Sequence, residues 1–325
     1  MGPIGIEVGK AILTRSDMNL LGAADPMPGK VGADLGILLG MPPRGDLVVG
    51  EARELYARTQ GSRGHEDVAV VCTGSRLDQV APQLEQAVDV GLHVVSTCEE
   101  LAFPWQRHAE IARSLDKRAR ERGVVVLGTG VNPGMVMDRL PLVITSACVR
   151  VDKVRVHRVV DAAKRRGPLR AKVGAGLSPD EFRQGVSQGR LGHVGLAESA
   201  ALLASGLGLP FSGVEETIEP VIAQVDAAGV TQGRVLGVKQ VAWVTHGEQP
   251  VVELVLEMYV GAEAPRDQVW VEGDPPLEVV VQGGFQGDRA TVGAVLNAIP
   301  IVAASPPGLH TVATLPVVAT LPVVR

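Results

Sequence analysis

The stretch GVVVLGTGVNPG, residues 123–134, decides the fold that we predict for this chain. Its apolar run, residues 124–127, is typical of a strand that is buried on both faces of a parallel sheet. The residues that follow it are nearly all small, namely Gly128, Thr129, Gly130, Asn132 and Gly134. Small residues where a strand stops let a ligand approach the backbone, and open α/β sheets bind ligands at this place. We interpret the stretch as the junction between a cofactor domain and a substrate domain.

Length and composition restrict the class of protein. A chain of 325 residues is long enough for two domains, and 39 glycines suit an α/β protein with many tight turns. The net charge of −5, with no basic cluster outside residues 164–170, argues against nucleic acid as the main partner. No apolar run is long enough to span a membrane. The three cysteines have no metal-like spacing, and without an export signal we expect reduced thiols in the cytoplasm.

The N-terminal segment has the pattern of the second half of a dinucleotide-binding βαβ unit. Gly2, Pro3, Ile4 and Gly5 lead into a helical pattern, and an apolar strand over residues 20–24 follows. We predict that these four residues bind the cofactor. The alternative is that the two glycines only start a helix. The first strand of the unit is truncated, so we expect the natural chain to begin upstream.

Asp25 ends the predicted strand, about 20 residues after the glycines, where such units place an acid for the adenosine ribose. A carboxylate there accepts hydrogen bonds from the ribose hydroxyls and repels a 2′-phosphate, which favours NAD. Lys30 lies nearby and could offset the repulsion, so NADP remains open. The alternative is that Asp25 is a turn residue before Pro26.

Two further strands, residues 67–71 and 92–95, flank a predicted helix over residues 77–90. Small polar residues follow each strand, and we predict that they face the cofactor: Thr73, Gly74, Ser96 and Thr97. Glu99 and Glu100 come next, at the carboxyl end of a parallel strand, where catalytic groups usually lie. The alternative is that these acids favour the start of the next helix.

The second half of the chain is rich in strands. Residues 153–160 alternate in polarity, with Val154, Val156 and Arg158 on one face, which suits an antiparallel sheet with one exposed face. Five more strands are predicted: residues 214–224, 234–245, 251–260, 268–272 and 277–282. A capping box at Ser178 and Glu181 predicts a helix start, and the last helix, residues 291–299, is expected to return to the first domain.

These patterns predict an α/β protein with a Rossmann-type parallel-sheet domain, its first strand truncated, and an α+β substrate domain with a largely antiparallel sheet. We place the dinucleotide-binding domain at residues 1–133, joined by 288–325, and the substrate-binding and dimerisation domain at residues 134–287. The tail repeats ATLPVV at residues 313–318 and 319–324. We expect this tail to pack on a neighbouring subunit or to be disordered.

The motifs GTGVNPG (residues 128–134) and MDRLP (residues 137–141) resemble the 2,4-diaminopentanoate dehydrogenase family. That family includes the native amine dehydrogenases and has a first domain like that of dihydrodipicolinate reductase. Nearly the whole chain shares the resemblance, in STCEEL (96–101), RR (165–166), PL (168–169), KVGAG (172–176), GHVGL (192–196), ES (198–199), GD (287–288), AT (290–291), NAIP (297–300) and PGL (307–309). It departs at the truncated first strand and the repeated tail.

The resemblance implies NAD(P)-dependent oxidative deamination of a small amine or diamino acid. The reverse reaction is reductive amination of a ketone or aldehyde with ammonia. The family's catalytic glutamate corresponds to Glu99 or Glu100, and the sequence does not choose between them. A carboxylate there can remove a proton from ammonium, return it as water leaves, and stabilise the iminium.

An amino-acid substrate also requires partners for its other groups. A cation for its carboxylate is expected among Arg158, Arg165, Arg166, Lys172 and Arg190, with solvated surface charge as the alternative. His193, between glycines, is a candidate for substrate contact or for a structural role. Asn132 could bind substrate or the nicotinamide amide, or cap the next helix. Asp161 could orient an amine, or pair with Arg165 or Arg166.

Two other functions remain open. One is reduction of a cyclic imine, as the relationship of the first domain allows. The other is a non-catalytic dinucleotide-binding sensor, against which the paired acids argue, because a sensor needs no proton-transfer group. We further expect a homodimer, since exposed strands of a second domain often pair across a two-fold axis.

Overall fold

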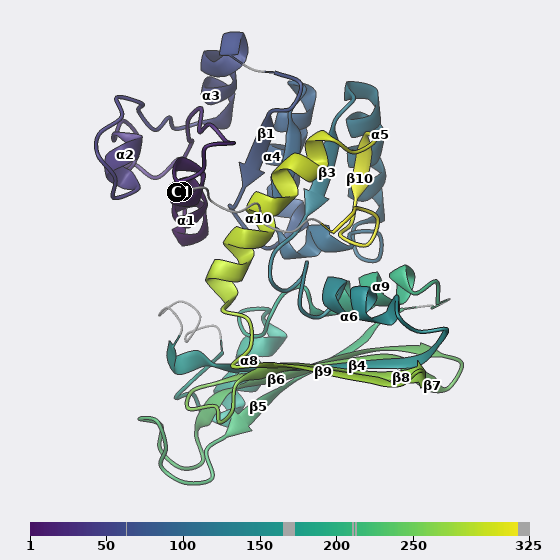
Figure 1. Cartoon of the computed structure of the whole chain (residues 1–325). Helices are drawn as coiled ribbons and strands as arrows, with labels where there is room; N and C mark the ends of the chain where they lie inside the picture. Colours follow the sequence, from purple (N-terminus) through teal and green to yellow (C-terminus); the bar gives the residue numbers. More distant parts are fainter. Residues whose placement is uncertain (63, 165–172, 210, 212, 318–325) are drawn as a thin grey trace. The chain divides into compact units, whose positions relative to one another are not determined.

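The computed structural model describes residues 1–62, 64–164, 173–209, 211 and 213–317. The chain folds into two units, which are drawn in Figure 1. The first comprises Met1–Gly134 and Gly287–Arg325, and the second comprises Met135–Gln286. None of the described helices is long and apolar enough to cross a membrane.

The first unit contains a parallel four-stranded sheet of the Rossmann type, which confirms the predicted fold class. Its strands stand in the order β1, β2, β3, β10, with bounds Val68–Val71, His93–Ser96, Val125–Gly128 and Gly308–His310. The longer helices of the unit are α1 (Pro3–Leu13), α3 (Ala52–Thr59), α4 (Leu77–Asp89), α5 (Ala109–Arg122) and α10 (Gly287–Ala303). The last helix therefore returns to this sheet, where it packs on β2 and β3.

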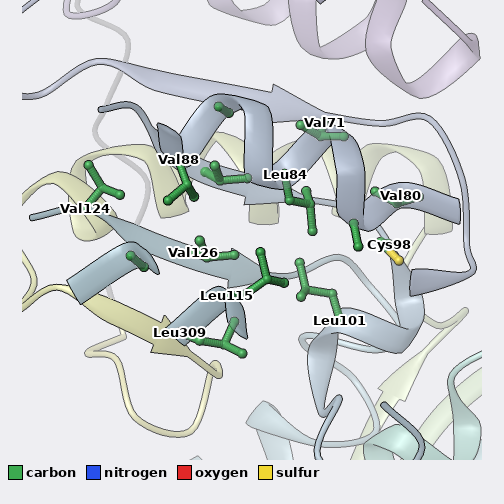
Figure 2. Packing of buried hydrophobic residues seen from close by; sticks show 14 of the residues in the cluster. Val71, Val80, Leu84, Val88, Cys98, Leu101, Leu115, Val124, Val126 and Leu309 are labelled. Carbon is green, nitrogen blue, oxygen red and sulfur yellow. The ribbon is translucent and has the colours of Figure 1, made fainter. Parts of the chain in front are cut away.

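The core of the first unit lies between the sheet and helices α4 and α5 (Figure 2). Val94 and Val126, from neighbouring strands, are fully buried, as are Leu84 of α4 and Leu115 of α5. Alternate strand residues point to one face of a sheet, and both helices present an apolar stripe to that face. This packing fixes the carboxyl ends of β1, β2 and β3, where the candidate site lies.

The expected strand over residues 20–24 does not join this sheet. It is reduced to a single parallel bridge between Ala24 and Val49, with hydrogen bonds Asp25 N to Val49 O and Val49 N to Ala23 O. The ladder cannot extend because the chain turns after Val49 into α3. Ala23 packs in a small separate core with Leu35, Leu39 and Val48. The short helix α2 (Leu35–Leu38) belongs to this core.

The second unit contains a six-stranded sheet in the order β5, β6, β7, β4, β8, β9. The strands span Glu215–Ile222, Val235–His246, Gln249–Tyr259, Arg150–Asp161, Arg266–Asp274 and Leu277–Gln282, in the same order. All neighbours are antiparallel except β4 and β7. The second sheet is thus largely antiparallel, as predicted.

Helices α6 (Arg139–Thr145), α8 (Pro179–Ser187) and α9 (Leu196–Gly206) contact the second sheet. The predicted capping box is present at the start of α8, where the side chains of Ser178 and Glu181 each bond to the other's backbone N–H. Helix α6 begins only at Arg139, because a series of turns follows the GTGVNPG motif.

Candidate functional site

The site is built around the 3₁₀ helix η2 (Glu99–Ala102), which follows β2 directly. The hydroxyl of Ser96 donates to Val71 O at 3.0 Å and accepts from Cys98 N at 3.1 Å. Thr97 N also donates to Val71 O, at 3.1 Å. Ser96 is fully buried, so its side chain ties the turn to the end of β1. This arrangement favours a structural role for Ser96 over the predicted cofactor contact.

Glu100 has its carboxylate fully engaged within the first unit, and only 3% of the residue is exposed. Its Oε1 accepts from Arg76 Nη1 at 3.0 Å. Its Oε2 accepts from the backbone N–H of Leu77 at 2.7 Å and lies 2.8 Å from His108 Nε2. The N–H groups of a helix's first turn have no partner within the helix. Glu100 therefore joins the start of α4 to the residue before α5.

Glu99 differs from its neighbour. Successive residues of a 3₁₀ helix project about 120° apart, so Glu99 leaves η2 in another direction from Glu100, and it is half-buried. Of the two acids that the sequence could not separate, Glu100 holds the fold of this region together. Glu99 lies in the same turn, at the same edge of the sheet.

Gly128, the first small residue of the motif, packs against the backbone of η2. A Cβ on Gly128 would lie 2.7 Å from the carbonyl carbon of Leu101 and 2.8 Å from Ala102 N, closer than atoms can approach. In addition, Thr129 N donates to Ser96 O at 2.9 Å. The glycine was predicted to admit a ligand. The structure shows instead that it admits the chain's own backbone, and so holds η2 against β3.

The rest of the motif folds back on itself. The peptide bond between Asn132 and Pro133 is cis, and a Cβ on Gly134, whose φ is +122°, would overlap the backbone of Gly130. Val131 N donates to Thr291 Oγ1 of α10 at 3.2 Å. Asn132 is buried and thus lies in a closely packed turn at the carboxyl end of β3.

The predicted cofactor residues of the N-terminus form the beginning of α1. Gly2 is the N-cap and Pro3 the first helical residue. The helical ladder begins with Ile6 N donating to Gly2 O at 3.0 Å, so the N–H groups of Ile4 and Gly5 precede it. A Cβ on Gly5 would lie 3.8 Å from Cys72 Cβ. The start of α1 is therefore beside the end of β1.

Asp25 is buried and already paired. Its Oδ1 accepts from Met27 N at 2.9 Å, and its Oδ2 accepts from Lys30 Nζ at 2.8 Å and contacts the Met1 ammonium group. The bond to Met27 N makes it a turn residue, as the alternative interpretation expected. The pair with Lys30 brings a positive charge to the acid, as the sequence suggested.

The loop after β1 holds the other two cofactor candidates. Thr73 is exposed and its hydroxyl bonds to Gln83 Oε1 at 2.7 Å. A Cβ on Gly74 would lie 3.2 Å from Val80 Cγ2, so the loop lies close to α4. The nearby Cys98 is a buried thiol that donates to Ser75 O at 3.3 Å, and burial raises the pKa of Cys98 to about 12. It is not the nucleophile of a reaction at neutral pH.

In the second unit, Arg158 lies on β4 and is buried, so its side chain is not open to a substrate carboxylate. Its Nη1 donates to both oxygens of Asp267, at 2.8 and 2.9 Å, and its Nη2 donates to Phe285 O at 3.0 Å. Burial raises the pKa of Asp267, while the Arg158 guanidinium opposes this. A buried cation with these partners favours a structural role over the predicted substrate contact.

Asp161, at the end of β4, accepts from two backbone groups. Its Oδ1 lies 2.9 Å from Ala163 N and 3.1 Å from Gly261 N. These bonds cap the turn after β4 and hold it to the end of β7, which favours a structural role. Three of the cations predicted for the substrate carboxylate lie outside the described residues: Arg165, Arg166 and Lys172. Arg190 bonds to Gln188 Oε1 at 2.8 Å on the surface.

His193 lies in the glycine-rich loop between α8 and α9 and is half-buried. Its backbone N–H donates to Gln240 Oε1 at 2.9 Å, and its carbonyl accepts from Gln240 Nε2 at 2.8 Å. Gln240 was not singled out from the sequence. Its only signal was a polar residue at an inward position of an otherwise apolar strand face.

Two other motif residues lock helices together. Ser199 Oγ donates to Asp138 Oδ2 at 2.8 Å, and both residues are fully buried. Asp138 also accepts from Arg139 N at the start of α6. The motifs MDRLP and ES thus bind each other, and join α6 to α9. Among the described residues, no group of three or more His, Cys, Asp or Glu side chains could hold a metal ion.

Comparison with known proteins gives three related findings. A sequence model of the 2,4-diaminopentanoate dehydrogenase C-terminal domain matches residues 135–323. The 2,4-diaminopentanoate dehydrogenase of Acetoanaerobium sticklandii is 31% identical over 295 residues, which cover 85% of this chain and 80% of the relative. The solved structure of an amine dehydrogenase from Mycobacterium smegmatis has a TM-score of 0.83 and 26% identity, covering 98% of this chain and 94% of that chain.

A more limited similarity concerns another reductase. The 4-hydroxy-tetrahydrodipicolinate reductase of a Synechococcus species is 34% identical over 99 residues, which cover 29% of this chain and 35% of the relative. The similarity to the two dehydrogenases extends over most of the chain, whereas the similarity to this reductase covers less than a third of it.

Proposed function

Because this chain belongs to the 2,4-diaminopentanoate dehydrogenase family and is an NAD(P)-dependent oxidoreductase, we propose that it oxidatively deaminates a small amine or diamino acid resembling 2,4-diaminopentanoate. In the reverse direction it aminates a ketone or aldehyde with ammonia. The observation that carries the proposal is the place of Glu99, in the turn that follows β2 at the carboxyl end of the parallel sheet, where such folds bind their ligands.

The first unit fits a dinucleotide. The first-turn N–H groups of Ile4 and Gly5, beside the end of β1, form the kind of helix N-terminus that binds a pyrophosphate. Asp25 lies about 20 residues on, at the position for the adenosine ribose. Thr73, Gly74, Thr97 and Asn132 follow the strands of the same sheet and would lie along the rest of the cofactor. When bound, the cofactor accepts the hydride from the substrate carbon.

Glu99 is the proposed proton-transfer group. An amine is protonated at neutral pH, and an ammonium group cannot push out a hydride. The Glu99 carboxylate accepts a proton from the ammonium and passes it to solvent, and its restored negative charge stabilises the iminium that forms as hydride leaves. The same carboxylate then removes a proton from the water that attacks the iminium and returns it to the nitrogen of the carbinolamine, which then releases ammonia. In the reverse direction each proton moves the opposite way.

The second unit is the proposed substrate domain. His193 is the side chain that we assign to substrate contact there, because the fold uses buried polar groups to hold its backbone while its side chain stays half-buried. An imidazole can donate a hydrogen bond to a carboxylate or a carbonyl. Arg158 and Asp161 are left out of the substrate site because the hydrogen bonds of their side chains hold strands and turns of the fold together.

We also propose a homodimer formed through the face of the second sheet opposite to α9. Charged side chains on that face pair across strands, for example Lys153 and Arg155 with Glu253 at 3.5 Å. Arg155 also lies over the Trp270 ring, 5.3 Å from its centroid. A face whose charges neutralise one another is suited to meet its own copy. Sedimentation should give twice the chain mass, and Trp270→Glu should shift it to the monomer.

A panel of amines tests the proposed reaction. The wild-type chain is incubated with NAD or NADP and each amine, 2,4-diaminopentanoate included, while absorbance at the reduced nicotinamide band is followed. Two results together support the proposal. The oxidised cofactor is reduced only when an amine is present, and the reduced cofactor is oxidised when the matching ketone and ammonia are both present. Cofactor oxidation by cyclic imines without ammonia would indicate the reductase instead. Cofactor binding without turnover on any substrate would indicate a sensor.

A further inference from the structure

The loop of residues 189–195, GRLGHVG, packs closely on its neighbours at Leu191 and Gly192. Leu191 fills space that side chains would occupy in its neighbours, because a Cβ on Gly185 would lie 2.6 Å from Leu191 Cδ1 and one on Gly174 would lie 3.2 Å from it. Gly192 has a φ of +103°, and a Cβ there would lie 2.9 Å from Ile218 Cδ1. Gly192 therefore allows the loop to pack closely against Ile218 of the sheet.

Gln240 binds the backbone of His193, the histidine of this loop. It stands on β6 with none of its surface exposed. Its Oε1 accepts from His193 N at 2.9 Å, and its Nε2 donates to His193 O at 2.8 Å. Both backbone polar groups of His193 are thus bound by one side chain, in the way a neighbouring strand would bind them.

Glu216 determines which way the carboxamide faces. Glu216 Oε1 accepts the second N–H of Gln240 Nε2 at 2.8 Å. If the carboxamide turned over, its oxygen would face two acceptors, the carbonyl of His193 and the carboxylate of Glu216, and its NH₂ would face the His193 N–H. Only the observed orientation satisfies all three groups, so Glu216 and Gln240 together set one backbone position for His193.

We propose that Gln240, oriented by Glu216, is a positioning residue that fixes the direction of the His193 imidazole. Its effect on catalysis rests on the proposed function, in which His193 contacts the substrate. Its effect on His193 itself does not. Neither an apolar nor an acidic residue at position 240 can do the same, because the first lacks both bonds and the second lacks the donor and adds charge beside Glu216.

The first experiment observes the imidazole directly. The Cε1–H signal of His193 is assigned in the NMR spectrum by its loss in His193→Ala. Gln240→Met, which keeps the length of the side chain, should shift and broaden this signal while the other histidines keep theirs. The matched control is Gln268→Met, which removes another sheet glutamine that bonds to a glutamate, Glu278, and should leave the His193 signal unchanged. An unchanged signal in Gln240→Met would overturn the proposal.

A second variant covers the case in which Gln240→Met does not fold. Glu216→Ala leaves Gln240 in place and removes only the group that orients it, so the His193 signal should shift in the same direction by a smaller amount. No shift would contradict the proposal.

The second experiment measures catalysis. Gln240→Met should raise the KM for the amine roughly tenfold, the loss of about one hydrogen bond, with kcat changed less than KM. In the His193→Ala background, Gln240→Met should add little further increase in KM, because its effect passes through His193. An equal increase in both backgrounds would contradict the proposal. Absence of amine turnover in the wild-type chain would refute the proposed function alone, since the NMR arm stands without it.

Discussion

The Glu100 carboxylate lies 2.8 Å from His108 Nε2 and 2.7 Å from the backbone nitrogen of Leu77. This acid therefore connects two helix starts across the turn that carries Glu99. The sequence does not distinguish the two adjacent glutamates, whereas the structure gives Glu100 a structural role.

Glu100→Ala should destabilise the protein more than Glu99→Ala does. Removing the Glu100 carboxylate leaves the buried N–H of Leu77 without its acceptor, which costs about 1–3 kcal/mol of unfolding free energy. Glu99 is half-buried, whereas Glu100 is 3% exposed, so the loss of Glu99 should cost less unfolding free energy than the loss of Glu100. Urea denaturation monitored by circular dichroism compares the two variants. Equal destabilisation by both would contradict the assignment.

The buried pair of Arg158 and Asp267 should behave as a structural unit. Arg158→Met leaves the Asp267 carboxylate buried beside Phe285 N and without its cation, which should cost about 3–5 kcal/mol. The double variant Arg158→Met, Asp267→Leu should be less destabilised than Arg158→Met, because no charge is left behind. Thermal unfolding of the single and double variants measures the coupling. A double variant that is destabilised at least as much as Arg158→Met would contradict this description of the pair.

Stability should rise with pH in the range where His93 titrates. His93 Nδ1 accepts from Val125 N at 3.1 Å and Nε2 lies 3.0 Å from His65 O, so the folded ring is neutral. Burial lowers the pKa of His93 below its usual value of about 6.5. Between the lowered and the usual pKa the unfolded chain binds more protons, so unfolding free energy falls as pH falls through that window.

The variant His93→Asn tests this contribution. An asparagine can still accept from Val125 N but does not titrate. Burial also lowers the pKa of His157, so the variant should keep part of the slope. We expect the denaturation free energy of His93→Asn to fall less steeply than that of the wild type between about pH 7 and pH 5. An unchanged slope would contradict this account of His93.

Cofactor preference should depend on Lys30. Its Nζ lies 2.8 Å from Asp25 Oδ2, so it partly neutralises the acid that would repel a 2′-phosphate. Lys30→Gln should leave Asp25 less neutralised and lower kcat/KM for NADP more than for NAD, by roughly tenfold or less. Exposed Lys117→Gln on α5 is the control and should change neither value. A fall for NAD alone would rule out this role.

The sequence predicted the sheets better than the site. Strand runs and the capping box at Ser178 depend on local pattern, and the structure has them. The inward position of Arg158 was already visible, since it shares a face with Val154 and Val156, but its partner Asp267 follows 109 residues later. No local pattern can reveal such a partner.

The separation of Glu99 from Glu100 depended on contacts of the same distant kind. Leu77 is the first residue of α4 and His108 precedes α5, and only the folded chain brings them to Glu100. The segment 20–24 was mispredicted for a related reason: its apolar residues suit a strand, but the neighbouring segment turns away after Val49. The propensity of the residues favours a strand, but the strand forms only where a neighbouring segment can pair with it.

The central claim is that Glu99 transfers the protons of an amine dehydrogenase. The most direct measurement compares amine-dependent NAD or NADP reduction by the wild type and by Glu99→Gln, with binding of the reduced cofactor followed by its fluorescence. We predict that Glu99→Gln loses at least about 100-fold in kcat, as expected for loss of a general acid–base group, and still binds the reduced cofactor. A Glu99→Gln variant that deaminates the same amine at a near-native rate would contradict the claim.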